Sequence, residues 1–231
     1  PAAVPLSLQP GRAETQAQPL GCVLIIGPWN YPFHLLLQPL VSALAAGNTA
    51  VLKPSEHAPA TAALVAELVA RHLDPGVVRV VQGDGQVAQE LLQLRFDHIF
   101  FTGGERVGRL VMAAAAPHLT PVTLELGGKS PAVVLADADL EVTAKRLIWG
   151  KSLNGGQTCV APDHLLVEES IRQELIGRLS SRITACFGAD PLQSPDLARI
   201  VNRAQYERLS GLLEGARQRG QILFGGQSDP E

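Results

Sequence analysis

Residues 21–53 read GCVLIIGPWNYPFHLLLQPLVSALAAGNTAVLK, and this stretch decides the fold class of the chain. It begins with a short, continuous apolar run at residues 21–27, continues through a helix-length apolar segment at residues 33–46, and ends in a second apolar run at residues 50–53. A strand, a helix and another strand in this order are typical of a βαβ unit in a buried parallel sheet.

The same alternation extends downstream for another seventy residues or so. Further strands are expected at residues 77–82, 98–101 and 121–124, and further helices at residues 59–73, 86–94 and 107–116. We therefore predict an α/β fold with a Rossmann-like, doubly wound parallel sheet. Ligands of such sheets bind beyond the carboxyl ends of the strands, so the residues that follow each strand are the candidates for a site.

A glycine-rich stretch at residues 126–131, LGGKSP, predicts a hinge into a second α/β domain. We expect one domain over residues 1–126 and the first part of a second domain over residues 127–231. The second domain is expected to hold strands at residues 132–135 and 164–167 and helices at residues 140–151, 171–187 and 204–219.

The two ends of the chain carry weaker signals. The first twenty residues, with a Gln-Pro-Gly turn at residues 9–11, suggest a hairpin, and the apolar run at residues 221–224 looks like a strand. Met112 is the only methionine and the chain begins at Pro1, so we interpret the sequence as an internal piece of a longer protein.

Composition excludes several classes of protein. The 231 residues carry 19 basic and 22 acidic side chains, with no basic run, which argues against a nucleic-acid groove or a polybasic membrane patch. No apolar stretch is long enough for a transmembrane helix. The three cysteines, Cys22, Cys159 and Cys186, have no C-x-x-C spacing, which argues against a zinc site or a disulfide framework and favours a reducing, cytoplasmic location.

Cys159 is the candidate nucleophile. It ends the segment NGGQTC at residues 154–159, in which two glycines allow close approach of the backbone and turn N–H groups towards one point. Such surroundings lower the pKa of a thiol and supply donors for an oxyanion. Cys22 and Cys186 are interpreted instead as buried small hydrophobes. A core or loop thiol is the alternative for Cys159, and its local context leaves the two readings equally open.

Two further residues could take part in catalysis. Glu125 ends a predicted strand before two glycines, where a partly buried carboxylate can act as a general base; the alternative is a surface acid. Asn30 follows Trp29 after the first strand, where an amide can donate to an oxyanion; the alternative is a turn-forming asparagine.

A dinucleotide site is indicated by the residues after two other strands. Lys53 and Glu56 flank the exit of the second strand, where a carboxylate can accept ribose hydroxyls, or simply stabilise a helix N-terminus. The junction after the fourth strand lets a phosphate approach a helix N-terminus, and it comprises Thr102, Gly103, Gly104, Glu105, Arg106, Val107 and Gly108.

The six histidines show no paired spacing typical of a metal site. Sequence distance alone does not exclude a hydrolase with a Cys/His pair, but no feature of the sequence favours one.

Four segments in this order resemble the signatures of the NAD(P)-dependent aldehyde dehydrogenase superfamily, most closely its class 3-type branch of fatty and aromatic aldehyde dehydrogenases. They are PWNYPF at residues 28–33, KPSE at residues 53–56, LELGGKSP at residues 124–131 and GQTC at residues 156–159. One such segment is a weak signal, whereas the ordered set is highly specific.

The resemblance implies an NAD or NADP cofactor, bound by the domain of residues 1–126, and a catalytic domain that begins at residue 127. It also implies a homodimeric parent protein and an aldehyde substrate, which is either aliphatic, with a medium or long chain, or aromatic. It implies that Cys159 attacks the aldehyde, that Asn30 and the Cys159 N–H hold the oxyanion, and that Glu125 activates the water that hydrolyses the thioester. Trp29 joins the cofactor-binding residues on the same basis. The departures are Glu105, where the family usually has a serine or threonine, Ser152, where an apolar or aromatic residue is common, and a nicotinamide-ribose motif that would lie beyond Glu231.

Two other functions stay open at this point. One is an acylating relative that passes the thioester to coenzyme A, which the presence of Glu125 disfavours. The other is a non-catalytic, truncated remnant that at most binds nucleotide. An unrelated Rossmann-type binding module would need all four signatures to coincide by chance.

Overall fold

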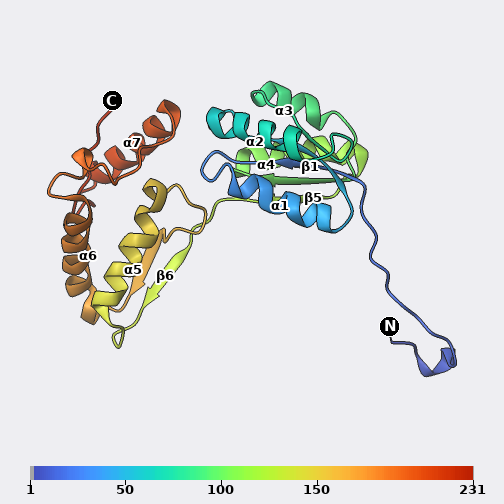
Figure 1. Ribbon diagram of the computed structural model, residues 1–231. Coiled ribbons are helices and arrows are strands. Elements are labelled where there is room, and N and C mark those ends of the chain that lie inside the picture. The colour runs from blue at the N-terminus through green and yellow to red at the C-terminus, as the bar shows by residue number, and fades with distance from the viewer. Residues whose placement is uncertain (1–2, 231) are drawn as a thin grey trace. The chain divides into compact units, whose positions relative to one another are not determined.

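Five parallel strands form the first sheet, in the spatial order β3-β2-β1-β4-β5 (Figure 1). The strands are β1 Cys22–Ile26, β2 Thr49–Lys53, β3 Val78–Val80, β4 His98–Thr102 and β5 Val122–Glu125. Register is set by pairs such as Ile26 with Lys53 on one side and Ile26 with Phe101 on the other. The order and direction of the strands confirm the doubly wound parallel sheet.

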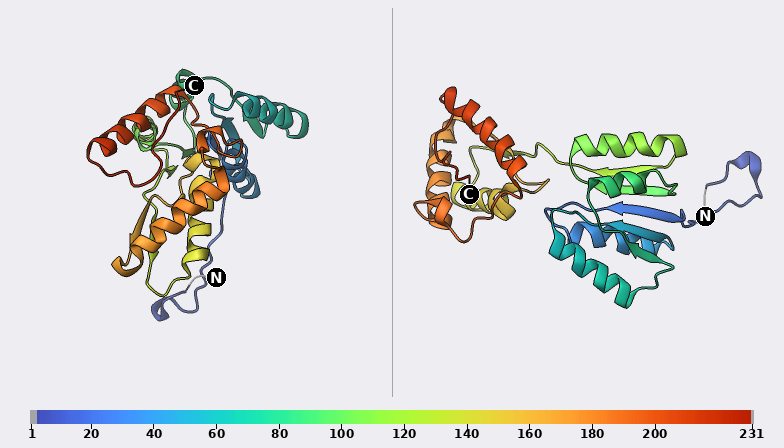
Figure 2. Two further views of the ribbon diagram at one scale, coloured as in Figure 1. Left: turned by 90° about the vertical axis from the view of Figure 1, so that its left-hand side faces the viewer. Right: turned by 90° about the horizontal axis from the view of Figure 1, so that it is seen from above.

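One helix follows each of the first four strands and leads to the next. These are α1 His34–Ala45, α2 Pro59–His72, α3 Gly85–Leu92 and α4 Glu105–Ala115. The chain winds from β1 outwards to β3, returns to β4 beside β1, and continues to β5 on the far side. Helices therefore lie on both sides of the sheet (Figure 2).

Alternate side chains of the central strands serve opposite faces of the sheet. Val23 and Ile25 of β1 pack in one buried cluster with residues of α1 and α2. Leu24 and Ile26 point to the other face, where the register aligns them with Ile99 and Phe101 of β4, all of them buried. Because both faces are covered, these strands are continuously apolar instead of alternating.

The second unit is built on a βαβ motif of its own. Two parallel strands, β6 and β7, are joined through α5, and two further helices follow. The elements are β6 Pro131–Val134, α5 Leu140–Ser152, β7 His164–Val167, α6 Arg172–Phe187 and α7 Arg203–Gln218. Short 3₁₀ helices complete the chain: η1 Leu6–Leu8, η2 Ala116–His118, η3 Leu153–Gly156, η4 Glu169–Ile171 and η5 Pro191–Gln193.

The computed structural model describes residues 3–230, and the chain divides into two units, Pro1–Glu125 and Leu126–Glu231. The boundary expected from the sequence was one residue later. The cofactor-binding role of the first unit and the catalytic role of the second stay predictions. Among residues 3–230, no helix is both long enough and apolar enough to cross a membrane.

The hairpin expected in the first twenty residues falls partly outside the described residues and stays a prediction. Residues 3–20 contain η1 and a single bridge residue, Ala13, and are almost entirely exposed. Two other expectations are corrected by the structure. Residues 221–224 form no strand, since in the described part of the second unit β6 and β7 pair only with each other. The apolar run at residues 147–149 predicts three core side chains, but Trp149 is 70% exposed, because it lies on the outer face of α5 while Ile148 is buried.

Candidate active site

The carboxyl edge of the first sheet gathers most of the predicted site residues. Gly27, directly after β1, continues the ladder by donating to the carbonyl of Lys53 at 3.0 Å. Gly103, directly after β4, does the same to the carbonyl of Glu125 at 3.0 Å. The strands thus end side by side, and the chain turns away in opposite directions after β1 and β4, which makes this the topological switch point.

Trp29 and Asn30 lie in the bend between β1 and α1, and both are half-buried. The start of α1 packs closely on the end of β1, because a Cβ at Gly27 would lie 2.9 Å from Leu36 Cδ1. Gly27 is therefore required for the close approach of the helix. This approach fixes where the bend carrying Asn30 leaves the sheet.

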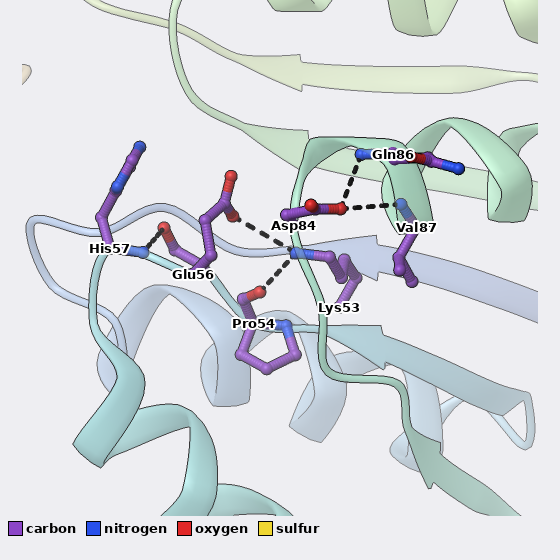
Figure 3. Close-up of polar contacts among 8 residues, drawn as sticks. Lys53, Pro54, Glu56, His57, Asp84, Gln86 and Val87 are labelled. Carbon is purple, nitrogen blue, oxygen red and sulfur yellow. Dashed lines mark hydrogen bonds and ion pairs between the residues drawn. The ribbon is translucent and has the colours of Figure 1, made fainter.

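Lys53 and Glu56 form an anchored ion pair after β2 (Figure 3). Lys53 is 2% exposed, and its Nζ donates to the carbonyl of Pro54 at 2.8 Å and to Glu56 Oε2 at 3.4 Å. The Glu56 side chain is 38% exposed, so its carboxylate reaches solvent while the buried Lys53 ammonium fixes its position through the ion pair. A buried ammonium is tolerated because its donors are directed at a carbonyl and a carboxylate.

The alternative role for Glu56, as an acid in the first turn of a helix, is wrong. Helix α2 begins at Pro59 and its first turn contains no acidic residue. The turn between β2 and α2 is instead held by Ser55, whose hydroxyl accepts from the backbone N–H of His57 at 3.3 Å. Glu56 is available to a ligand at the edge of the sheet.

The junction between β4 and α4 separates into a close-packed part and an open part. A Cβ at Gly103 would clash with Cζ of Phe101, so only glycine fits beside that ring. Nothing lies within 4 Å of a Cβ built at Gly104, the N-cap of α4. The open N-terminus of α4 therefore fits the predicted phosphate position, since its first N–H groups have no partner within the helix.

The remaining residues of this junction have different roles. Glu105 pairs with Arg109 one turn later, where Arg109 Nε donates at 3.1 Å. Arg106 and Val107 are exposed, and Gly108 is buried on the inner face of α4. Gly108 thus serves helix packing, whereas Gly104 caps the helix and Glu105, Arg106 and Val107 form its first turn.

Glu125 is the last residue of β5 and is exposed. Its backbone pairs with Thr102 of β4, which is half-buried. The strand register therefore holds the backbone of Glu125 at the same edge as Lys53 and the Gly103 turn. This is the position from which a carboxylate could reach a ligand beyond the strands.

Cys159 lies in the connection between α5 and β7, and it is exposed. The connection turns sharply through η3, where Asn154, Gly155 and Gly156 have φ of 53°, 63° and 78°. Positive φ is costly for most residues, which explains the two glycines and the asparagine. A turn from the N–H of Ala161 to the carbonyl of Thr158, at 3.1 Å, then presents Cys159.

The Cys159 loop, residues 153–163, lies against the glycine segment that precedes β6. A Cβ at Gly128 would lie 3.1 Å from the carbonyl oxygen of Cys159, and Ser130 Oγ donates to the same oxygen at 3.5 Å. The N–H of Asp163 donates to the carbonyl of Ser130 at 2.9 Å. Since β6 and β7 are parallel, both segments lie at the amino ends of these strands.

The other two cysteines differ from expectation. Cys186 is exposed near the end of α6, because that helix buries only Leu175 fully and its last turn faces solvent. Its expected burial is therefore wrong. Cys22 is half-buried at the start of β1, where its N–H donates to Asp97 Oδ2 at 2.8 Å. All three cysteines are free thiols.

The structure thus brings the predicted residues together in two groups, one within each unit. The first holds Trp29, Asn30, Lys53, Glu56, Glu125 and the residues from Thr102 to Val107; the second holds Cys159 with Gly128 and Ser130. The side chain of Gln157, which stands inside the GQTC signature, bonds across the second unit, a contact that the sequence did not predict. Among residues 3–230, no group of three or more acidic, histidine or cysteine side chains could hold a metal ion.

Known proteins match this chain over nearly its whole length. The sequence profile of the aldehyde dehydrogenase family matches residues 3–231. Aldehyde dehydrogenase family 3 member A2 of Rattus norvegicus is 49% identical over 218 residues, which cover 94% of this chain and 44% of the relative. A class 3-type relative was the expectation, and it is confirmed.

Solved structures agree with the sequence matches. The substrate-bound AldH of Staphylococcus aureus superposes with a TM-score of 0.89 at 45% identity, over 99% of this chain and 50% of that one. An aldehyde dehydrogenase of Mycobacterium tuberculosis complexed with NAD+ superposes with a TM-score of 0.84 at 34% identity, over 91% of this chain and 44% of that one. This chain therefore spans about half the length of the relatives it matches. Its four ordered signatures, its doubly wound sheet and these matches lead to one conclusion: the chain belongs to the aldehyde dehydrogenase family.

Proposed function

We propose that this chain carries the nucleophile, the general base and part of the cofactor site of an NAD(P)-dependent aldehyde dehydrogenase. The observation that carries the proposal is Cys159, an exposed thiol on a loop built from left-handed residues, in a chain whose relatives are named as aldehyde dehydrogenases. An aliphatic aldehyde of medium or long chain, or an aromatic aldehyde, is the proposed substrate, on the basis of the similarity to a family 3 member.

The cofactor fits the residues at the carboxyl edge of the first sheet. The α4 N-terminus is open above Gly104, which suits a phosphate, and the Glu56 carboxylate is held outward by Lys53, which suits ribose hydroxyls. The NAD+ complex of the Mycobacterium tuberculosis structure supports this choice of cofactor. When bound, the nicotinamide would accept a hydride from the substrate carbon.

The protein residues would divide the reaction into two halves. The Cys159 thiolate adds to the aldehyde carbon, and the oxyanion accepts hydrogen bonds from the Asn30 amide and the Cys159 N–H. Loss of hydride from the tetrahedral adduct leaves a thioester on Cys159. Glu125 then takes a proton from water, the hydroxide adds to the thioester, and the carboxylic acid departs as the thiolate is restored.

Turnover by the 231-residue chain tests this proposal directly. NADH formation from octanal and NAD+ should require Cys159 and should persist in Cys186→Ala, which removes the other exposed thiol of the same unit. Glu125→Gln should slow hydrolysis of the thioester more than its formation, so that acylated Cys159 accumulates and can be detected by mass spectrometry.

Other outcomes would select the competing functions. NADH formation that depends on added coenzyme A would favour an acylating relative. Binding of NAD+ without turnover, by a chain shown to be folded, would favour a nucleotide-binding role. A cytoplasmic location is also proposed, since all three cysteines are free thiols.

A further inference from the structure

The side-chain amide of Gln157 joins the Cys159 loop to a segment more than forty residues away in sequence. Its Nε2 donates to the carbonyl of Asn154 at 2.9 Å and to the carbonyl of Arg199 at 3.0 Å. Its Oε1 accepts from the N–H of Val201 at 2.9 Å. An amide has two N–H donors, so both are used in these bonds.

The three partners fix the orientation of the amide. Two are carbonyl oxygens and one is an N–H group, so a rotated amide would place Oε1 against the two carbonyls and Nε2 against the N–H. Each of these three is a backbone atom, which leaves little freedom to adapt. Gln157 therefore specifies one arrangement of the loop relative to residues 199–201.

A second close contact joins the same two segments. Gly155 has a φ of 63°, and a Cβ there would lie 2.8 Å from the carbonyl oxygen of Ala198. The loop thus lies directly on the backbone of residues 198–201, at its glycine turn and through the Gln157 amide. We call these contacts of Gly155 and Gln157 with residues 198–201 the clamp. Cys159 comes two residues after Gln157, so the clamp controls the path of the backbone that leads to the thiol.

We propose that Gln157 is a positioning residue for Cys159: it holds the loop so that the thiolate and the Cys159 N–H keep the mutual geometry needed to form a tetrahedral adduct. The inference rests on the proposed role of Cys159 as nucleophile. Addition to a carbonyl requires both the thiolate and an aimed N–H donor, because negative charge develops on the oxygen. Alkylation of the thiolate requires no such donor, and the two reactions therefore separate positioning from reactivity.

The variant Gln157→Glu tests the clamp with almost no change in shape. It replaces Nε2 by an oxygen, so the contacts with the Asn154 and Arg199 carbonyls become repulsive while the Val201 N–H keeps an acceptor. In the 231-residue chain, acylation of Cys159 by p-nitrophenyl acetate and its alkylation by iodoacetamide are followed by peptide mass spectrometry over a range of pH. Acylation should fall about 10- to 100-fold, while the rate and pH profile of alkylation stay unchanged.

Three controls complete the design. Gln193→Glu makes the same change of charge at an exposed position of the same unit and should leave both reactions unchanged. Cys186 serves in every sample as an internal reference for alkylation. Gln157→Ala removes the attraction without adding repulsion, and it should lower acylation in the same direction by a smaller factor.

The outcomes are distinct. Equal losses of acylation and alkylation in Gln157→Glu, unchanged acylation, or failure of both Gln157 variants to fold would show a purely structural role and overturn the inference. A wild-type Cys159 that is not acylated at all would instead contradict the proposed function. These results are separable, because the second is read on the unmodified chain before any Gln157 variant is examined.

Discussion

A methyl group at Gly128 would lie 3.1 Å from the backbone carbonyl oxygen of Cys159. The two residues belong to different connections, one leading into β6 and one leading into β7, and the parallel pairing of these strands brings them together. The LELGGKSP and GQTC signatures, which are separate in sequence, are thus packed against each other through backbone atoms. Gly128 acts as a spacer that sets how closely the Cys159 loop can approach.

Gly128→Ala should displace the Cys159 loop. The added methyl group would be closer to the Cys159 carbonyl than nearly all real Cβ contacts, and the loop must give by a few tenths of an ångström. We expect acylation of Cys159 by p-nitrophenyl acetate to fall about tenfold, because small displacements at a reacting centre are costly. Gly127→Ala is the matched control, since a Cβ there meets nothing within 4 Å. Equal effects of the two variants would contradict the spacer role.

Lys53→Met should weaken both the fold and the nucleotide site. The change leaves the buried carbonyl of Pro54 without its Nζ donor and releases Glu56, so the free energy of unfolding should fall by about 1–3 kcal/mol. Affinity for NAD+ should fall with it. Urea unfolding and nucleotide titration measure the two effects. Arg71→Met, which breaks the exposed pair with Glu67, should change neither; equal losses in both variants would argue against a special role for Lys53.

Asn48→Ala should destabilise the first unit. Asn48 is 7% exposed, and its Oδ1 accepts from the N–H groups of Leu20 and Gly21 at 2.7 and 3.0 Å while its Nδ2 donates to the carbonyl of Ala43 at 3.1 Å. Loss of these bonds should lower the free energy of unfolding by about 2–4 kcal/mol, as measured by urea denaturation. Asn48→Asp keeps the two accepted bonds but turns a carboxylate oxygen towards Ala43. It should also be destabilising, and a wild-type midpoint in Asn48→Asp would count against the importance of the third bond.

Stability should depend on pH through His98. Burial lowers the pKa of His98 below its usual 6.5, because the charged imidazolium is poorly solvated beside β5, where Nε2 lies 3.0 Å from Thr123 Oγ1. The unfolded chain therefore binds a proton at His98 more readily than the folded chain does. The stability gained by burying the neutral imidazole is fully present above pH 6.5, and it is lost as the pH falls through the lowered pKa of the folded state. Urea midpoints at about pH 7.5 and about pH 5.5 should differ less in His98→Gln than in the wild type.

The exposed His72 provides the control for that measurement. His72→Gln should leave the wild-type difference between the two pH values intact. If His72→Gln reduces the difference as much as His98→Gln does, burial of His98 is not the cause.

The first sheet shows how far the local pattern reaches. All five strands and four helices of the first unit lie where the apolar runs and helical periodicity place them, with differences of at most about two residues at the ends, as is usual for element boundaries. The strands are buried on both faces and the helices along one face, so the positions of the apolar residues in the sequence show which element each segment forms. The rule that ligands lie beyond the carboxyl ends of strands then selected Asn30, Glu56 and Glu125 without further information.

The second unit shows where that rule stops. Cys159 lies before β7 and Gly128 before β6, so this group is at the amino edge of its sheet. The glycine context of the cysteine and the GQTC signature pointed to it instead. Cys186 was expected to be buried because cysteine is usually buried, yet it lies on an exposed side of the last turn of α6.

The sequence by itself determined the order of the elements and the identity of the residues at the strand ends, because both follow from the local pattern of apolar residues. The alternation of apolar strands and helices then predicted the doubly wound sheet, although its strands pair over long distances in sequence. Only the tertiary structure decided that Lys53 is buried beneath Glu56, that Gly128 meets the Cys159 carbonyl, and that the Gln157 amide binds Arg199 and Val201. Those relationships join segments through single hydrogen bonds and close approaches of the backbone. A single glutamine or glycine creates no periodic pattern in the sequence that would indicate its contact partner. The partner can therefore be identified only from the folded structure.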